Sequence, residues 1–266
     1  MVSQEYADSL PPRGWISNRS LTHIILGAVL SIIIIAAASA SALINKTFIS
    51  AFLTERGSFQ PIMLSISLTL LSYAFSRRRK IKKEFTNTSR NWLFKKGEFN
   101  SPGEALNETI IVLSARKDIL ANRQLRILQT LRDTGSRSIA KEVHDEDASL
   151  TDDEISQSFY IPKMLIWALP MIGFLGTVTG ISDSVSGFSG LIENAANINL
   201  IKQSLQAVMG GLATAFDTTI LGIISALIVT LLISLTEKSE FNLSQAVNSH
   251  INDKLFVRIN PDGTFE

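Results

Sequence analysis

The stretch Pro170-Met-Ile-Gly-Phe-Leu-Gly-Thr-Val-Thr-Gly180 lies inside an apolar run that extends from Met164 to Ile181. A run of about 18 apolar residues is just long enough to cross the hydrocarbon core of a bilayer as a helix. Its small residues allow other helices to come close, and Gly176 and Gly180 have the spacing that is common in membrane helix pairs. The stretch therefore predicts a membrane helix surrounded mostly by protein or by a polar cavity.

Helix geometry divides the small and polar residues of this run into two strips, since residues at i, i+4, i+7 and i+11 share one face. The first strip consists of Gly173, Thr177, Gly180 and Ser184. The second consists of Gly176, Thr179, Asp183 and Gly187. Both strips are narrow and weakly polar, so we expect close packing there rather than contact with lipid.

The composition favours a membrane protein over an enzyme. Of the 266 residues 45% are hydrophobic and 18% are charged, and the charged fraction is below the roughly 25% of soluble domains. The net charge of +1 gives no electrostatic argument for nucleic acid. The absence of cysteine excludes disulfides and thiolate chemistry, and the three histidines lack metal-ligand spacing. With no nucleotide-binding motif either, we expect no cofactor and no metal.

Four membrane spans are expected: 21–45, 59–76, 161–185 and 206–236. The second is the shortest of these apolar stretches. Six basic residues follow it directly: Arg77, Arg78, Arg79, Lys80, Lys82 and Lys83. Such an excess of positive charge against a membrane end predicts the cytoplasmic side. Segments 1–20 and 237–266, and with them both termini, are then cytoplasmic.

The remaining polar segment, 77–160, is predicted to be a cytoplasmic helical region. Ser101-Pro-Gly-Glu104 reads as a helix start and Gly135 as the end of that helix. A helix packed in a small bundle is favoured over a dedicated partner-binding helix. Residues 142–154 are acidic and are interpreted as a solvated face or a linker. Thr151 and Glu154 could cap the next helix, which is expected to run unbroken into the membrane.

The last predicted span follows an outer connection over 182–206 and contains one acidic residue, Asp217. An Asp in mid-span costs about 2.5–3.5 kcal/mol on insertion scales, which makes it a functional hypothesis by default. The alternative is that Asp217 lies near the outer interface, hydrated or hydrogen-bonded to Thr214. Gly210 shares this face, which suits an inter-subunit contact or an outer vestibule.

A different face of the same helix carries small residues and one hydroxyl. Asp217 and Thr219 are about 200° apart around a helix, so they cannot share a face. Thr219 instead groups with Ala215, Gly222 and Ala226. This face suits close packing around a pore or against a partner helix. A further stretch, 243–257, is expected to form an amphipathic helix, and Asn260-Pro-Asp-Gly263 a turn.

The residues Ile172-Gly-Phe-Leu-Gly-Thr-Val-Thr-Gly-Ile181 resemble the signature of the MotA/TolQ/ExbB proton-channel family. The segment 211–222 and the apolar run after it resemble the last membrane helix of that family. The resemblance covers roughly 161–235. It implies an all-α, homo-oligomeric ring, commonly of five subunits, in the bacterial inner membrane and in contact with its lipids.

The resemblance also implies a partner and a path for the ion. The ring surrounds the single-span helices of an ExbD/TolR/MotB-like dimer, whose Asp carries the ion. Thr177 and Thr219 match the hydroxyl residues that line this path. Thr218 beside Thr219 resembles sodium-using members, so the transported ion is H⁺ or Na⁺. Ion flow is thought to drive rotation of the ring against the partner.

The chain departs from the family pattern in three ways. Transport-type members often carry Glu at the position of Thr214, whereas the acid here is Asp217, one turn deeper on the same face. Many members have a proline in the last helix, and 207–235 has none. Four spans resemble the flagellar-stator branch, whereas the Gly-Thr motif is closer to the transport branch.

Two other functions compete with an ion-channel subunit. A self-contained secondary transporter should show internal repeats and several intramembrane ionisable groups, and only Asp217 is a strong candidate. A structural scaffold would use its glycines for packing alone. A hydrolytic enzyme ranks last, because the sequence offers no nucleophile–base pair. The work driven by ion flow is not indicated by the residues.

Overall fold

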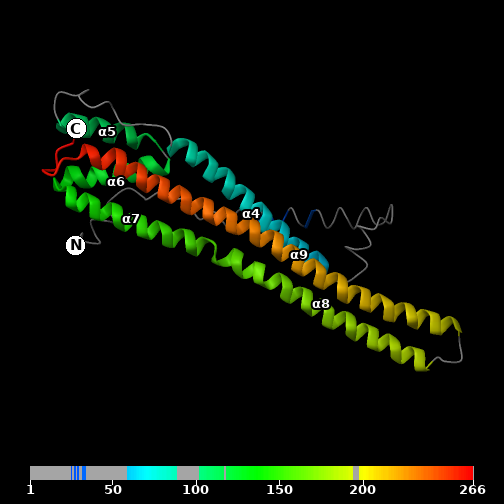
Figure 1. Ribbon diagram of the computed structural model, residues 1–266. Helices are drawn as coiled ribbons and strands as arrows, with labels where there is room; N and C mark the ends of the chain where they lie inside the picture. Colours follow the sequence, from blue (N-terminus) through cyan, green and yellow to red (C-terminus); the bar gives the residue numbers. More distant parts are fainter. Residues whose placement is uncertain are drawn as a thin grey trace. The chain divides into compact units, whose positions relative to one another are not determined.

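The computed structural model consists of helices throughout the residues that it describes (Figure 1). Those residues are 59–88, 102–116, 118–193 and 198–265, with Ile25, Gly27, Val29, Ile32 and Ile33. Within them the only β pairing is an isolated bridge between Ile259 and Phe265. The all-α prediction is therefore confirmed for the described part of the chain.

The chain forms two compact units. The first, here called the membrane unit, comprises Arg19–Ser76 and Phe159–Leu235. The second, here called the polar unit, comprises Met1–Asn18, Arg77–Ser158 and Thr236–Glu266. Two helices have residues in both units: α4, Phe59–Thr88, and α9, Ile198–His250.

Three helical stretches of the described chain are long and apolar enough to cross a membrane. They include α4, α9 and most of α8, which is Tyr160–Glu193. The helix α4 begins at Phe59, where the second span was expected to begin. The first expected span, 21–45, lies outside the described residues except for five helical positions. One of these, Gly27, lies so close to α4 that an added Cβ would be 2.8 Å from Thr69 Cα.

The predicted outer connection over 182–206 is mostly helical in the structure. The helix α8 continues to Glu193 and α9 begins at Ile198, so most of the stretch is helical. Contacts between the two helices stabilise these additional turns. The Ser184 hydroxyl donates to the Val208 carbonyl at 2.9 Å, and a Cβ added at Gly187 would lie 3.1 Å from the Val208 nitrogen.

The expected unbroken helix entering the third span is interrupted at one residue. The helix α7, Arg137–Ser158, ends directly before Phe159, and α8 begins at Tyr160. The cause is Pro162, which has no N–H for the Ser158 carbonyl and whose ring clashes with that carbonyl. Regular bonding resumes where the Lys163 N–H donates to the Phe159 carbonyl at 3.0 Å.

The helix predicted to run from Pro102 to Gly135 is two helices. These are α5, Pro102–Ser114, and α6, Ile119–Thr134. The break is stabilised by Asp118, whose side chain accepts a bond from the Ala121 N–H and so caps α6. At the other end Gly135 is left-handed, with φ of 63°, as expected for the helix stop. The helix α6 packs against both α5 and α7, as in a small bundle.

The acidic stretch 142–154 is neither a linker nor a cap, because it lies inside α7. Most of its carboxylates are exposed, which fits the solvated face that was the other interpretation. Asp147 is the exception, since it is buried and accepts from Arg126 Nε at 2.8 Å. The buried Thr151 hydroxyl donates to the Asp147 carbonyl at 2.7 Å and also contacts Arg123. These polar groups therefore form part of the core between α6 and α7.

A buried ion pair joins α4 and α9 within the polar unit. Arg77 Nε donates to Glu240 Oε2 at 3.1 Å, and a terminal nitrogen of Arg77 donates to Glu240 Oε1 at 2.6 Å. Arg77 also donates to the Ser158 hydroxyl at 2.9 Å. Arg77 is 4% exposed and Glu240 is fully buried. Arg77 is thus set apart from the other basic residues that follow it on α4.

The helix α9 continues well beyond the expected end of the last span, to His250. The stretch 243–257 is not a separate helix, because it contains the end of α9 and two short helices. These are the π-helix η1, Ile251–Leu255, and the 3-10 helix η2, Phe256–Arg258. The predicted turn follows, with the Gly263 N–H bonded to the Asn260 carbonyl at 3.0 Å.

Acid is expected to destabilise the protein through His144, which is buried in α7 and packs on Phe256 at 5.6 Å between ring centroids. Burial and the neighbouring Arg123 lower the pKa of His144 from 6.5 to about 4, although Asp145 and Asp147 oppose this. The stabilisation is present above pH 6.5 and is lost as the pH falls from 6.5 towards 4. At pH 5 the loss should be about 2 kcal/mol.

The measurement is chemical unfolding of the purified protein at pH 7.5 and pH 5. The control is the His144→Leu variant, which keeps an apolar side chain against Phe256 and cannot titrate. The variant should lose about 2 kcal/mol less than the wild type between these pH values. Equal losses in the two proteins would rule out His144 as the origin of the acid effect.

Candidate functional site in the pair of helices α8 and α9

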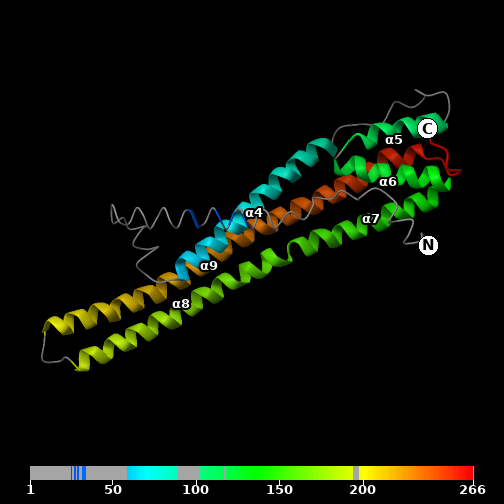
Figure 2. The ribbon, with the colours of Figure 1, turned by 180° about the vertical axis from the view of Figure 1, so that it is seen from behind.

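The helices α8 and α9 lie side by side and run antiparallel within the membrane unit (Figure 2). Three glycines of α8 permit this approach, because a Cβ on any of them would overlap with α9. At Gly173 it would lie 2.9 Å from the Thr218 carbonyl oxygen, and at Gly176 2.6 Å from Thr218 Oγ1. At Gly180 it would lie 2.5 Å from the Gly211 carbonyl oxygen. Both glycine strips predicted for this helix therefore contact α9.

Glycines of α9 are equally close to α8. A Cβ on Gly211 would lie 2.5 Å from Ser184 Oγ and 2.6 Å from the Gly180 carbonyl oxygen. A Cβ on Gly222 would lie 2.9 Å from the Leu169 carbonyl oxygen. The backbones of the two helices are thus in direct contact at two levels.

Between these levels the hydroxyls of Thr177 and Thr219 meet and form a hydrogen bond. We call these two residues the threonine pair. Thr177 Oγ1 is also 3.1 Å from the Ala215 carbonyl and 3.2 Å from the Gly173 carbonyl. Thr219 Oγ1 is 3.2 Å from the Ala215 carbonyl. Each hydroxyl has one proton and more than one acceptor within reach, so the pair can exchange hydrogen-bond partners.

The other predicted ion-path residues lie apart from the threonine pair. Thr218 is fully buried against Gly176, and its hydroxyl donates to the Thr214 and Ala215 carbonyls on its own helix. Thr214 and Asp217 are both partly exposed. The Thr214 hydroxyl donates to the Gly210 carbonyl at 3.0 Å. The structure thus brings together Thr177 and Thr219, while Asp217 and Thr214 lie on another face of α9.

The small-residue face of α9 is covered by other helices of the same chain. Ala215 is buried beside Gly180. Further along, Gly222 approaches Met63 of α4, whose sulfur would lie 3.4 Å from an added Cβ. Met63, Leu169 and Ala226 form a buried apolar cluster. Gly222 and Ala226 therefore pack within the chain rather than lining an open surface.

The opposite faces of both helices expose large apolar side chains. On α8 these include Trp167, Met171, Phe174, Leu175, Val178 and Ile181. On α9 they include Phe216, Ile220, Ile223, Leu227 and Leu231. Apolar faces of this extent are covered by lipid or by other protein in a membrane protein.

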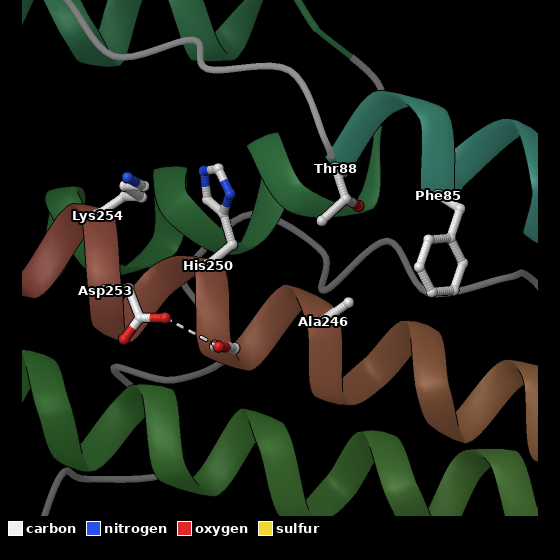
Figure 3. Close-up of a pocket in the computed structure, with 7 residues that line it drawn as sticks. Phe85, Thr88, Ala246, His250, Asp253 and Lys254 are labelled. Atoms are coloured by element: carbon white, nitrogen blue, oxygen red, sulfur yellow. Dashed lines mark hydrogen bonds between the residues drawn. The ribbon is translucent and has the colours of Figure 1, made fainter.

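A separate cavity of about 360 Å³ lies within the polar unit, between the end of α4 and the end of α9 (Figure 3). Its lining residues are Phe85, Thr88, Ala246, Ser249, His250, Asp253 and Lys254. Burial and the charge of Lys254 lower the pKa of His250, against an opposing effect of Asp253. Among the described residues no group of three His, Cys, Asp or Glu side chains could hold a metal.

Sequence reasoning missed the apolar contribution of α4 to this site. The sequence contains little indication of it, because Met63 lies in an apolar run whose residues show no helical periodicity that would mark a packing face. It also missed the contact between the two threonines, since their alignment depends on how two helices pack. The small-residue spacing on each helix and the family resemblance indicated that the two helices would face each other, but not which atoms would touch.

A multi-span helical membrane protein with a polar, glycine-packed helix pair is the class that these features define. The model of the MotA/TolQ/ExbB proton channel family matches residues 115–247, half of the 266-residue chain. The chain therefore belongs to the MotA/TolQ/ExbB proton channel family. Comparisons with curated proteins and with solved structures find no match. The matched residues include the whole of α8 and α9 as far as Val247, and therefore both residues of the threonine pair.

Proposed function

We propose that the chain is the ring subunit of an ion channel in the bacterial inner membrane. In this proposal five copies surround a single-span, ExbD/TolR/MotB-like dimer, and the flow of H⁺ or Na⁺ drives mechanical work or transport across the envelope. No cofactor takes part. Both termini lie in the cytoplasm, on the side of the basic residues after the second span.

The observation that carries the proposal is the threonine pair. Two hydroxyls that share carbonyl acceptors supply a polar lining, and such a lining can offer a hydrogen bond to a passing group. Hydroxyls do not carry a proton or a cation on their own, because they stay neutral at physiological pH. The ion carrier is therefore an acid, and we assign it to the Asp of the partner helix.

The exposed apolar faces of α8 and α9 support the assembly part of the proposal. In a ring, part of these apolar faces would contact lipid, and the rest would contact neighbouring copies of the chain and the partner helix. Asp217, Thr214 and Thr218 remain candidate ion-path residues. Because Asp217 and Thr214 are partly exposed on α9, their proposed place is a contact between subunits or an outer vestibule.

Replacing Thr177 or Thr219 with Val should lower ion flux at least tenfold. The lost hydrogen bond to a charged group is worth about 1.5–3 kcal/mol, and 1.4 kcal/mol in a barrier is a factor of about ten. Val has the shape of Thr, so the helix pair should stay folded. The measurement is ion flux into liposomes that contain the chain and its single-span partner, together with recovery of the partner by affinity purification.

The matched control is Thr230→Val. Thr230 lies on α9, as Thr219 does, and is exposed. Its hydroxyl donates within α9, to the Ala226 carbonyl at 2.6 Å. Its variant should conduct as the wild type does. Unchanged flux and unchanged partner recovery in Thr177→Val would favour a structural scaffold. Flux without any partner would favour a self-contained transporter.

A further inference from the structure

Between Arg77 and Glu84 every exposed residue of α4 is basic. Arg77 and Ile81 are buried, and Glu84 is partly buried and accepts a bond from the Ile119 N–H at 3.3 Å. The exposed residues between Arg77 and Glu84 share a positive charge: Arg78, Arg79, Lys80, Lys82 and Lys83. Glu84 is thus partly buried and bonded to α6, whereas the basic residues before it are exposed. We call these five residues the basic face of α4.

The position of the basic face along α4 matches the headgroup layer of a membrane. The helix begins at Phe59 and is continuous to Thr88. At 1.5 Å per residue, the stretch 59–76 is about 27 Å long, close to the roughly 30 Å of a hydrocarbon core. The next five to seven residues then lie within about 10 Å of its edge, where the phosphates are. Long Lys and Arg side chains can extend to that level.

We propose that the basic face of α4 binds the phosphate headgroups of anionic phospholipids in the leaflet where α4 leaves the membrane. Charge complementarity supports this occupant, since every exposed residue from Arg78 to Lys83 is basic. Continuity supports it too, because the same helix runs directly from apolar residues into the basic face. The site would hold this end of α4 at a fixed depth. It does not depend on ion conduction.

The test uses native mass spectrometry to measure the binding of phosphatidylglycerol and of phosphatidylcholine to the full-length protein in a neutral detergent. The variant combines Arg78→Gln, Lys82→Gln and Lys83→Gln. Each basic residue near an anionic surface contributes roughly fivefold to binding. Affinity for phosphatidylglycerol should therefore fall at least tenfold, whereas affinity for phosphatidylcholine should not change.

The matched control combines Arg132→Gln, Lys141→Gln and Lys254→Gln, which removes three exposed charges elsewhere in the polar unit. It should bind phosphatidylglycerol as the wild type does. The proposal is overturned if the basic-face variant keeps its affinity, or if the control loses as much. Tighter binding of an acidic polypeptide than of phosphatidylglycerol would also overturn it. Unchanged helix content and elution volume show that both variants remain folded.

Ion flux separates this proposal from the proposed function. The basic-face variant should lose lipid affinity, while the Thr177→Val variant should lose flux and keep lipid affinity. Lipid affinity therefore tests the lipid-binding proposal, and ion flux separately tests the proposed function.

Discussion

Replacing Glu240 with Ala is expected to lower the free energy of unfolding by about 3–5 kcal/mol. The structure places its carboxylate on Arg77 with two hydrogen bonds, and both side chains are buried. Removing the carboxylate leaves the guanidinium charge buried without its counter-ion. The cost of an uncompensated buried charge is larger than the net contribution of the pair itself. Chemical unfolding of the purified full-length protein, followed by circular dichroism, measures the change.

Two variants make this test specific. Arg78→Ala removes a neighbouring but exposed charge of α4, and it should change stability by no more than about 0.5 kcal/mol. The double variant Arg77→Met with Glu240→Leu removes both charges and keeps apolar volume, so it should be nearly as stable as the wild type. If Glu240→Ala unfolds at the same denaturant concentration as Arg78→Ala, the pair does not stabilise the fold.

Replacing Gly211 with Ala should destabilise the pair of helices α8 and α9 by about 3 kcal/mol, at the upper end of the usual cost of overpacking. The new methyl group would overlap with Ser184 Oγ at 2.5 Å and with the Gly180 carbonyl oxygen at 2.6 Å. The second of these is backbone, which cannot move away unless the helices separate. Unfolding in detergent would measure the loss.

Gly210 is the matched control because it is adjacent in sequence but has no atom within 4 Å of an added Cβ. Gly210→Ala should be neutral or stabilising by up to about 1 kcal/mol, since Ala is the better helix former. The two variants differ by one position and should change stability in opposite directions. A loss of stability in Gly210→Ala as large as in Gly211→Ala would mean that the close contacts of Gly211 with α8 are not the cause of the loss.

Much of the helix pair was predictable because helical periodicity decides which residues share a face. Gly173, Thr177 and Gly180 were placed on one strip, and all three contact α9. The grouping of Thr219 with Ala215 and Gly222 was likewise right. Which residue meets which across the pair could not be predicted, because the alignment of two helices depends on the packing of all their side chains.

Helix boundaries were predicted less well, although local signals existed. Pro162 lacks the N–H that would continue α7, and Asp118 is a favourable cap for α6. Both signals lie inside stretches whose apolar spacing suggested one continuous helix. The outer ends of α8 and α9 had no such signal, because contacts between the helices decide how far they extend.

Buried charges were the least predictable feature. Arg77 belongs to a run of basic residues, and Asp147 belongs to an acidic stretch, so neither stands out from its neighbours. Their burial depends on partners distant in the sequence, and for Arg77 and Glu240 the separation is 163 residues. Only the three-dimensional arrangement identifies which member of such a run is turned inward.

The backbone contacts between glycines of α8 and α9 have a mechanical consequence. Because the two backbones approach so closely, neither helix can slide or rotate along the other without steric collision. The two helices therefore move together as a rigid body. Any movement of the pair against its surroundings must then occur at the outward apolar surfaces, where large side chains such as Met171 and Phe216 are exposed. Under the proposed function, the moving contacts would then lie around this pair of helices and not within it.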